Sequence, residues 1–128
     1  MVPYLLVATG GAIGSVLRYG AGIAVGGLWR NAFPLGTLLI NIFGSLLMGA
    51  FVGTMARLLP GWQNEARLFF AVGVLGGFTT FSSFSLDAIV LAERGNLAAA
   101  GLYVIVSVGG GLFALWLALL LMRTGVSP

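Results

Sequence analysis

The sequence is dominated by four long apolar stretches that contain few charged residues. They cover residues 2–28, 35–59, 65–92 and 97–122, and each is close to the roughly 20 residues that an α-helix needs to cross a bilayer. Short connectors at residues 29–34, 60–64 and 93–96 carry Pro, Gly or Asn. Because hydrocarbon offers the backbone no hydrogen-bond partner, such stretches must be helical. The pattern predicts an all-α, multi-pass protein of the cell (inner) membrane, with four transmembrane helices in a single domain at residues 1–128.

Composition excludes several classes of function. The chain is 59% hydrophobic and only 7% charged, whereas a soluble domain carries roughly 25% charged residues, so membrane lipid must cover most of its surface. Its six basic residues are all Arg and are scattered, which gives no basis for binding nucleic acid. The absence of Cys and His excludes disulfides, thiolate chemistry and Cys/His metal sites. With no nucleotide-binding motif either, we expect that the protein is not an enzyme.

The Arg residues are divided almost evenly between the two ends of the predicted helices. One side holds Arg57, Arg67 and Arg123, and the other holds Arg30 and Arg94. Arg18 lies inside the first segment and tilts toward the second group. Because positive charge in short loops normally sets orientation, this near balance predicts insertion in both directions. A homodimer of opposite orientations is the natural product. The up-and-down order of four helices also predicts that both termini lie on one side of the membrane.

Glycine spacing predicts close contacts between helices. The 21 glycines include pairs four residues apart at Gly10/Gly14, Gly22/Gly26, Gly49/Gly53 and Gly73/Gly77. Small residues at this spacing share one face of a helix and let another helix approach closely in lipid. We expect most of these pairs to serve packing alone, within one chain or between two.

A few polar side chains fall inside the predicted helices, and some have two interpretations. Arg at the centre of a membrane helix costs about 2.5–3.5 kcal/mol on insertion scales, so Arg18 either reaches toward the nearest loop or lines a vestibule that attracts anions. Asn41 either bonds a neighbouring helix or offers N–H groups to an anion. Asp87, near the 93–96 connector, is either partly hydrated or a proton or cation site. Tyr103 and Ser107, four residues apart, place two hydroxyls on one helix face, which suits a polar track.

Residues 76–85, GGFTTFSSFS, interrupt the third apolar stretch with two Gly, five hydroxyl side chains and three Phe. Gly pairs followed by Thr and Ser are weak helix formers, so we predict that the third helix is broken near its middle. The carbonyls that a break frees must meet protein, water or an ion, and they suit a small hard cation such as Na⁺. Phe rings every third residue, alternating with hydroxyls, can attract an anion through ring edges and donors without a full charge. That combination suits an anion pore that must also release its ion.

Three stretches resemble the CrcB/Fluc family of fluoride channels. They are GGAIGSVLRY at residues 10–19, PLGTLLINIFG at residues 34–44, and residues 73–85, where GGFTTFSSFS is similar to the family signature GGFTTFSTFS. With the length and the four-helix plan, the resemblance covers essentially the whole chain. It implies a channel that passes fluoride passively across the membrane, lowers cytoplasmic fluoride and relieves its toxicity. It also implies an antiparallel dual-topology homodimer with a structural Na⁺ at the dimer interface.

The resemblance further implies roles for individual residues. Phe81 and Phe84 would be the pore aromatics and Asn41 the pore amide. The polar track would contain Ser83, Ser107 and Tyr103, with Thr80 adding a hydroxyl near the break and Arg18 at a vestibule. The backbone carbonyls of Gly76 and Thr79 would bind the Na⁺, shared with the partner. Two positions depart from the family pattern: Ser83 replaces the usual Thr and keeps its hydroxyl, and Asp87 replaces the usual Glu with a shorter carboxylate whose role stays open.

Two other function classes fit parts of the pattern. A small proton-coupled multidrug-type exporter can also insert in both directions, but it relies on a membrane-embedded Glu in its first helix. Residues 2–28 contain no acidic residue. A non-conducting membrane subunit that packs through Gly-rich faces would leave the cluster at residues 76–85 unexplained. The fluoride channel accounts for more of the sequence than either alternative.

Overall fold

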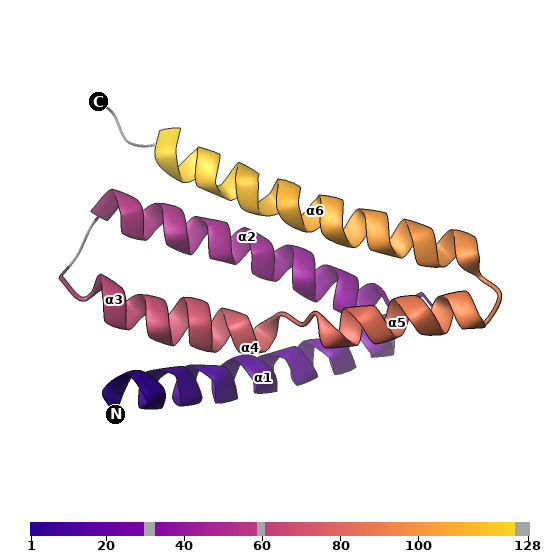
Figure 1. The fold of residues 1–128 in the computed structure, drawn as a ribbon, viewed down its shortest axis with the longest axis horizontal. Coiled ribbons are helices and arrows are strands. Elements are labelled where there is room, and N and C mark those ends of the chain that lie inside the picture. The colour runs from indigo at the N-terminus through magenta and orange to yellow at the C-terminus, as the bar shows by residue number, and fades with distance from the viewer. Residues whose placement is uncertain (30–32, 59–60, 125–128) are drawn as a thin grey trace.

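The computed structural model describes residues 1–29, 33–58 and 61–124, and this part of the chain contains helices and no strand. The helices are α1 (Val2–Leu28), α2 (Leu35–Leu58), α3 (Gln63–Ala66), the π-helical segment η1 (Arg67–Leu75), α4 (Gly76–Phe78), α5 (Ser82–Glu93) and α6 (Leu97–Thr124). The four predicted stretches are therefore helical except at residues 79–81 of the third, with Leu59 of the second outside the described residues. The all-α prediction is confirmed. The segments from α3 to α5 form one long bent element (Figure 1).

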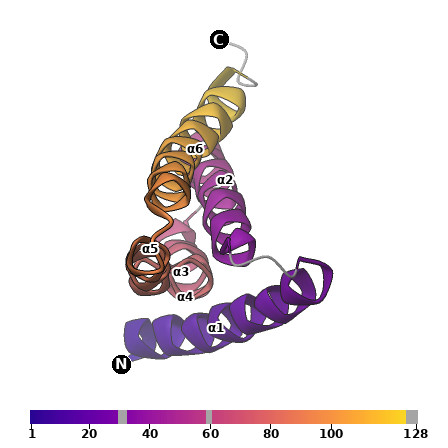
Figure 2. The ribbon, with the colours of Figure 1, turned by 90° about the vertical axis from the view of Figure 1, so that its right-hand side faces the viewer.

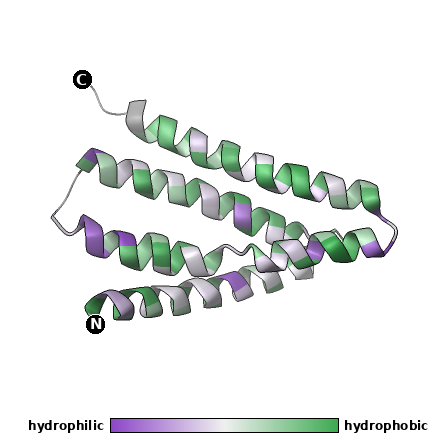
Figure 3. Cartoon of the chain, in the orientation of Figure 1, coloured by the Kyte–Doolittle hydropathy of each residue, from purple (hydrophilic) through white to green (hydrophobic). Residues whose placement is uncertain are grey.

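Three helical elements of the described chain are long and apolar enough to cross a membrane. They are Leu35–Leu58, Gln63–Glu93 and Leu97–Met122, and Figure 3 shows hydrophobic residues along most of their length. The chain is thus a multi-pass membrane protein. Helix α1 is also long, at 27 residues, but it contains Arg18, two Tyr and several Gly and is not among these three elements. Its place as a fourth membrane helix stays a prediction.

The bent element is interrupted at residues 79–81. Helix α4 ends at Phe78 because Thr79 adopts extended backbone angles, with φ −83° and ψ 157°, and the helix resumes at Ser82. The predicted break near the middle of the third helix is therefore present. It lies just beyond Gly76 and Gly77, which remain helical. The chain leaves the helix at the β-branched Thr pair, whose side chains restrict the helical backbone.

Two of the glycine pairs face each other where α1 packs against η1 and α4. A Cβ added to Gly73 would lie 2.9 Å from the Cα of Gly10, and one added to Gly77 would lie 2.6 Å from the carbonyl oxygen of Gly11. A Cβ on Gly14 would likewise collide with the backbone of η1. Glycine therefore lets the two backbones touch, as predicted from the spacing.

A third glycine pair joins α2 to α6. An added Cβ would lie 2.5 Å from the Leu115 carbonyl oxygen at Gly49 and 2.6 Å from the Met122 Cβ at Gly53. The pair Gly22/Gly26 differs, because a Cβ there would meet nothing within 4 Å. Three of the four pairs thus serve packing within the chain.

The bent element lies between α1 on one side and the α2–α6 pair on the other (Figure 2). A small buried cluster holds α5 against α2 and α6, and it consists of Leu38, Leu91, Ala100 and Tyr103. Helix α1 begins and α6 ends at the same end of the bundle (Figure 1), in agreement with the predicted placement of the termini. This arrangement brings α1, α2 and α6 around the break.

Candidate functional site

Side chains from two other helices bind the backbone at the break. On α2, the Nδ2 of Asn41 donates to the carbonyl oxygen of Thr80 at 3.0 Å, and the Thr80 N–H donates to Oδ1 of Asn41 at 2.9 Å. On α1, the Nε of Arg18 donates to the carbonyl oxygen of Gly77 at 3.2 Å. The Thr80 hydroxyl accepts the N–H of Ser83, in the first turn of α5, at 3.2 Å. Hydrogen bonds from α1 and α2 therefore hold the backbone at the break in a defined conformation.

The carbonyl oxygens of Gly76 and Thr79, beside the break, lack such partners among the described residues, as does that of Phe78. None of the hydrogen bonds in the described part of the chain reaches the carbonyl oxygens of Gly76 or Thr79. Gly76 is exposed and Thr79 is half-buried. Carbonyl oxygens are suitable ligands for a hard cation, and among the described residues no group of three or more His, Cys or acidic residues offers an alternative metal site. The donor type therefore fits Na⁺, but two oxygens from one chain would need further ligands.

A cavity of about 330 Å³, which we call the inner cavity, lies beside the break between α2, α5 and α6. Many of the predicted site residues line it, namely Asn41, Thr79, Thr80, Phe81, Phe84 and Ser107. The rings of Phe81 and Phe84 lie 5.9 Å apart between centroids, and 78% of the Phe81 side chain is exposed. The structure thus gathers the predicted pore aromatics and the pore amide around one space.

The Ser107 hydroxyl is the most informative atom of the inner cavity. Ser107 is only 7% exposed, and its Oγ is the one buried side-chain polar atom in the described residues that has no hydrogen-bond partner. Buried hydroxyls nearly always have a partner, because an unpaired donor removed from water is costly. A hydrogen-bond acceptor that enters the inner cavity would satisfy this donor.

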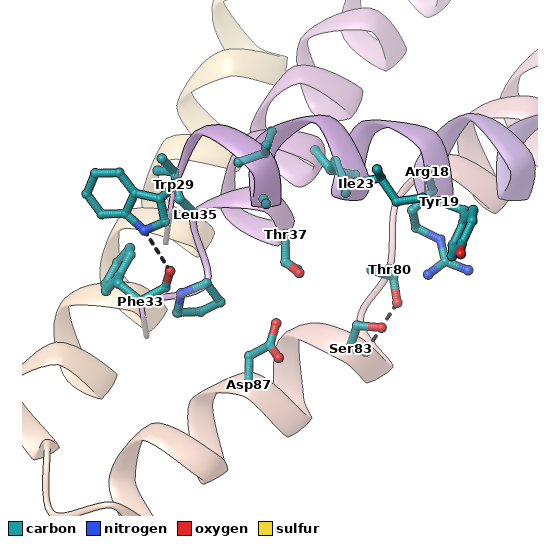
Figure 4. A pocket seen from close by; sticks show the side chains of 16 residues that line it. Arg18, Tyr19, Ile23, Trp29, Phe33, Leu35, Thr37, Thr80, Ser83 and Asp87 are labelled. Carbon is teal, nitrogen blue, oxygen red and sulfur yellow. Dashed lines mark hydrogen bonds between the residues drawn. The ribbon is translucent and has the colours of Figure 1, made fainter. Parts of the chain in front are cut away.

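A second cavity of about 550 Å³, which we call the vestibule cavity, lies between α1, the start of α2 and α5. Figure 4 shows the hydroxyls of Thr37, Thr80 and Ser83 along it, with the carboxylate of Asp87 beside them and Arg18 at one end. Thr80 lines both cavities. Thr80 is therefore the residue that the two cavities share.

At the other end of the vestibule cavity, the indole Nε1 of Trp29 donates to the carbonyl oxygen of Phe33 at 3.0 Å (Figure 4). This bond ties the last turn of α1 to the approach to α2. Gly22 and Gly26, the pair without a packing partner, line the same cavity. Because they have no side chains, the cavity extends up to the α1 backbone at these two positions.

Tyr103 lines neither cavity in the single chain. It is fully buried, and its hydroxyl donates to Oδ2 of Asp87 at 3.3 Å. Its ring lies 5.2 Å from that of Phe84 and meets Phe33 edge-on at 5.6 Å. Tyr103 therefore connects the carboxylate of the vestibule cavity to an aromatic wall of the inner cavity. Gly76, the other predicted residue outside both cavities, lies on the surface of α4.

Several lining residues were missed from the sequence. Thr37 lines the vestibule cavity and Ser45 the inner cavity, one turn to either side of Asn41 on α2. The four-residue spacing of these three polar residues places them on one helix face, so the sequence could have predicted that they line the same site. Gly44 also lines the inner cavity, where a Cβ would collide with the methyl group of Thr79. No pattern in the sequence marks that contact.

Comparison with known proteins places this chain among named channels. A family model described as CrcB-like protein, Camphor Resistance (CrcB), matches residues 5–119. The fluoride-specific ion channel FluC of Erythrobacter litoralis is 51% identical over 124 residues, which cover 93% of this chain and 90% of the relative. The protein of the same name from Rhizobium etli is 49% identical over 123 residues, covering 96% of this chain and 98% of the relative. Fluoride-specific ion channel FluC 1 of Nitrobacter hamburgensis is 54% identical over 104 residues, covering 81% and 82%.

Proposed function

The chain belongs to the CrcB-like family, and we propose on that premise that it lets fluoride leave the cytoplasm down its gradient and so relieves fluoride toxicity. It is a fluoride channel and not an enzyme, in keeping with relatives that match nearly its whole length. It is a multi-pass membrane protein, which we assign to the inner membrane of a bacterium. A proton-coupled exporter is not favoured, because α1 carries no acidic residue.

The unpaired Ser107 hydroxyl is the observation that carries this function. Fluoride is a small, strong hydrogen-bond acceptor, and the inner cavity offers it a buried donor beside the rings of Phe81 and Phe84. Ring edges carry partial positive charge and add attraction for an anion. Because no charged side chain lines the inner cavity among the described residues, the anion is held without a full countercharge. Such binding is weak enough to release the ion.

We propose that the vestibule cavity is the entrance to the pore, and, among the described residues, it is lined by charged side chains, unlike the inner cavity. The guanidinium of Arg18 and the hydroxyls of Thr80 and Ser83 lie along it and offer donors to an anion, whereas the Asp87 carboxylate, to which Tyr103 donates, opposes one. Thr80 then leads from the vestibule cavity to the inner cavity. The second N–H of Asn41 Nδ2 is available for the anion at that point, since the first is used by the Thr80 carbonyl.

A single chain forms only part of the proposed pore. Phe81 is largely exposed, Gly76 is exposed, and the inner cavity borders both the break and the chain surface. We propose that a second copy in the opposite orientation covers this face, with α1 as the fourth membrane helix and membrane lipid around the dimer. The near balance of Arg between the two ends supports the opposite orientations. Within that dimer, Tyr103 would reach the polar track of Ser107 only through Asp87, because its ring is fully buried and its hydroxyl donates to that carboxylate.

The same dimer would complete the cation site. The carbonyl oxygens of Gly76 and Thr79 from two copies would provide four ligands, which suits Na⁺ far better than two. Bound Na⁺ would supply positive charge that holds the two helix breaks together. The carbonyl oxygens of Gly76 and Thr79, which accept no hydrogen bond in the described part of the chain, support this site.

The substitution Ser107→Ala tests the observation that carries the function. Removing the hydroxyl should lower fluoride efflux from proteoliposomes by about tenfold, a change that corresponds to roughly one hydrogen bond to a charged ion. Ser107→Thr, which keeps the hydroxyl, should retain more flux than the Ala variant. Ser15→Ala, at an exposed residue of α1 that lines neither cavity, is the matched control. Unchanged efflux in the Ser107→Ala protein would contradict the role of this donor.

A further inference from the structure

The close contact between α1 and α4 places one cation beside a broken helix. Gly14 touches the backbone near Val74 so closely that no side chain fits, and Arg18 lies four residues later on the same face of α1. The Nε of Arg18 consequently lies 3.2 Å from the carbonyl oxygen of Gly77, and this bond is half-buried. The contact joins residues 59 positions apart in the sequence.

The Gly77 carbonyl needs a donor because of the break. In a continuous helix it would accept the N–H of Phe81, but the chain leaves the helix at Thr79. The carbonyl lies in the last turn of α4, where helix dipoles concentrate partial negative charge. An Arg side chain is well suited to this position, since its N–H groups and positive charge both stabilise exposed carbonyls.

We propose that Arg18 is a positioning residue that holds the helix break in its conducting shape through the Gly77 carbonyl, and that conduction requires its Nε–H donor more than its charge. This inference rests on the proposed fluoride channel. Gly77 is adjacent to Gly76 and two residues from Thr79, so fixing its carbonyl also fixes the two carbonyls proposed for Na⁺. Arg18 thereby couples α1 to the cation site and to the hydroxyl of Thr80.

Two substitutions separate the donor from the charge. Arg18→Gln places an amide nitrogen at the same number of bonds from Cα as Nε, so it keeps a donor for Gly77 and removes the charge. Arg18→Lys keeps the charge but puts a methylene group at the position of Nε. A positioning role predicts faster fluoride efflux from Arg18→Gln than from Arg18→Lys, by up to about tenfold, the scale of one hydrogen bond between neutral groups. The same two changes at Arg94, an exposed loop residue, are matched controls.

The relative efflux of the two Arg18 variants supports or overturns the positioning role in each case. Faster efflux from Arg18→Lys would overturn the proposal and assign Arg18 to anion attraction in the vestibule cavity. Equal efflux from the two variants, whether high or low, would overturn it as well, because the donor would then make no difference. The expected advantage of Arg18→Gln should persist at saturating fluoride, where attraction of the anion no longer limits flux.

Thermal unfolding of the detergent-solubilised protein gives a second readout that does not depend on conduction. The Gln variant should unfold at a higher temperature than the Lys variant, since it keeps a donor for the Gly77 carbonyl. If the native protein carried no fluoride, the proposed function would fail. The order of the two unfolding temperatures would still test the hydrogen bond between Arg18 and the Gly77 carbonyl. If the native protein conducts and the order is reversed, the Arg18 inference fails alone.

Discussion

Asn41 and Thr80 form a reciprocal pair: the Asn41 amide donates to the Thr80 carbonyl at 3.0 Å and accepts the Thr80 N–H at 2.9 Å. One side chain on α2 thus replaces both helical hydrogen bonds that Thr80 gives up at the break. The two interpretations of Asn41 from the sequence, contact between helices and anion donor, are compatible. The first is observed, and the second needs only the remaining N–H of the amide.

Replacing Asn41 with Ala should leave both backbone groups of Thr80 without a partner. Each unsatisfied buried group costs about 1–3 kcal/mol, so the unfolding temperature and fluoride efflux should both fall. Thermal unfolding in detergent and efflux from proteoliposomes measure these effects. Asn64→Ala is the control, because Asn64 is exposed and makes one long contact of 3.4 Å with Arg67. An Asn41→Ala protein as stable and as active as Asn64→Ala would refute the assigned role.

The two rings of the inner cavity should be needed for flux but not for assembly of the dimer. Phe81→Ile and Phe84→Ile keep apolar bulk and remove the ring edge, so efflux should fall by roughly tenfold while the elution volume of the dimer stays the same. Phe113→Ile, at an exposed aromatic that lines neither cavity, is the matched change. Wild-type flux in both cavity variants would contradict the ring-edge argument.

The glycine contacts predict a large difference between two identical substitutions on α1. Gly14→Ala forces a Cβ into the backbone of η1 and should destabilise the protein by about 1–3 kcal/mol. Gly20→Ala meets nothing within 4 Å and should be neutral or slightly stabilising, because Ala favours helix by about 1 kcal/mol over Gly. Thermal unfolding of both variants checks this. Equal melting temperatures would show that α1 does not pack as described.

Removal of Na⁺ should weaken the channel if the carbonyls of Gly76 and Thr79 bind this cation between two copies. Replacing Na⁺ with a large organic cation such as N-methylglucamine should slow fluoride efflux or shift the protein from dimer to monomer in detergent. Restoring Na⁺ should reverse either change. If neither fluoride efflux nor the fraction of dimer changes when Na⁺ is removed, the proposed Na⁺ site between two copies is wrong.

The sequence predicted the elements far better than the bonds between them. Apolar length defined the helices, and the Gly-Thr-Ser composition of residues 76–85 located the break, although the chain leaves the helix at Thr79 rather than at the glycines. Glycine spacing predicted packing without naming partners, because which two faces meet depends on the whole bundle. The spacing of Tyr103 and Ser107 suggested one polar track, yet Tyr103 is buried against Phe84 and bonded to Asp87. Such contacts arise from tertiary packing and leave no local pattern.

The most direct test of the channel is the release of fluoride from liposomes that contain the purified protein. Liposomes loaded with fluoride and diluted into fluoride-free buffer should lose it rapidly to a fluoride-selective electrode, with no proton gradient and no nucleotide present. Matched liposomes loaded with chloride should retain their anion. The account predicts rapid fluoride efflux with chloride held back, whereas no fluoride efflux, or equal loss of both anions, would contradict it.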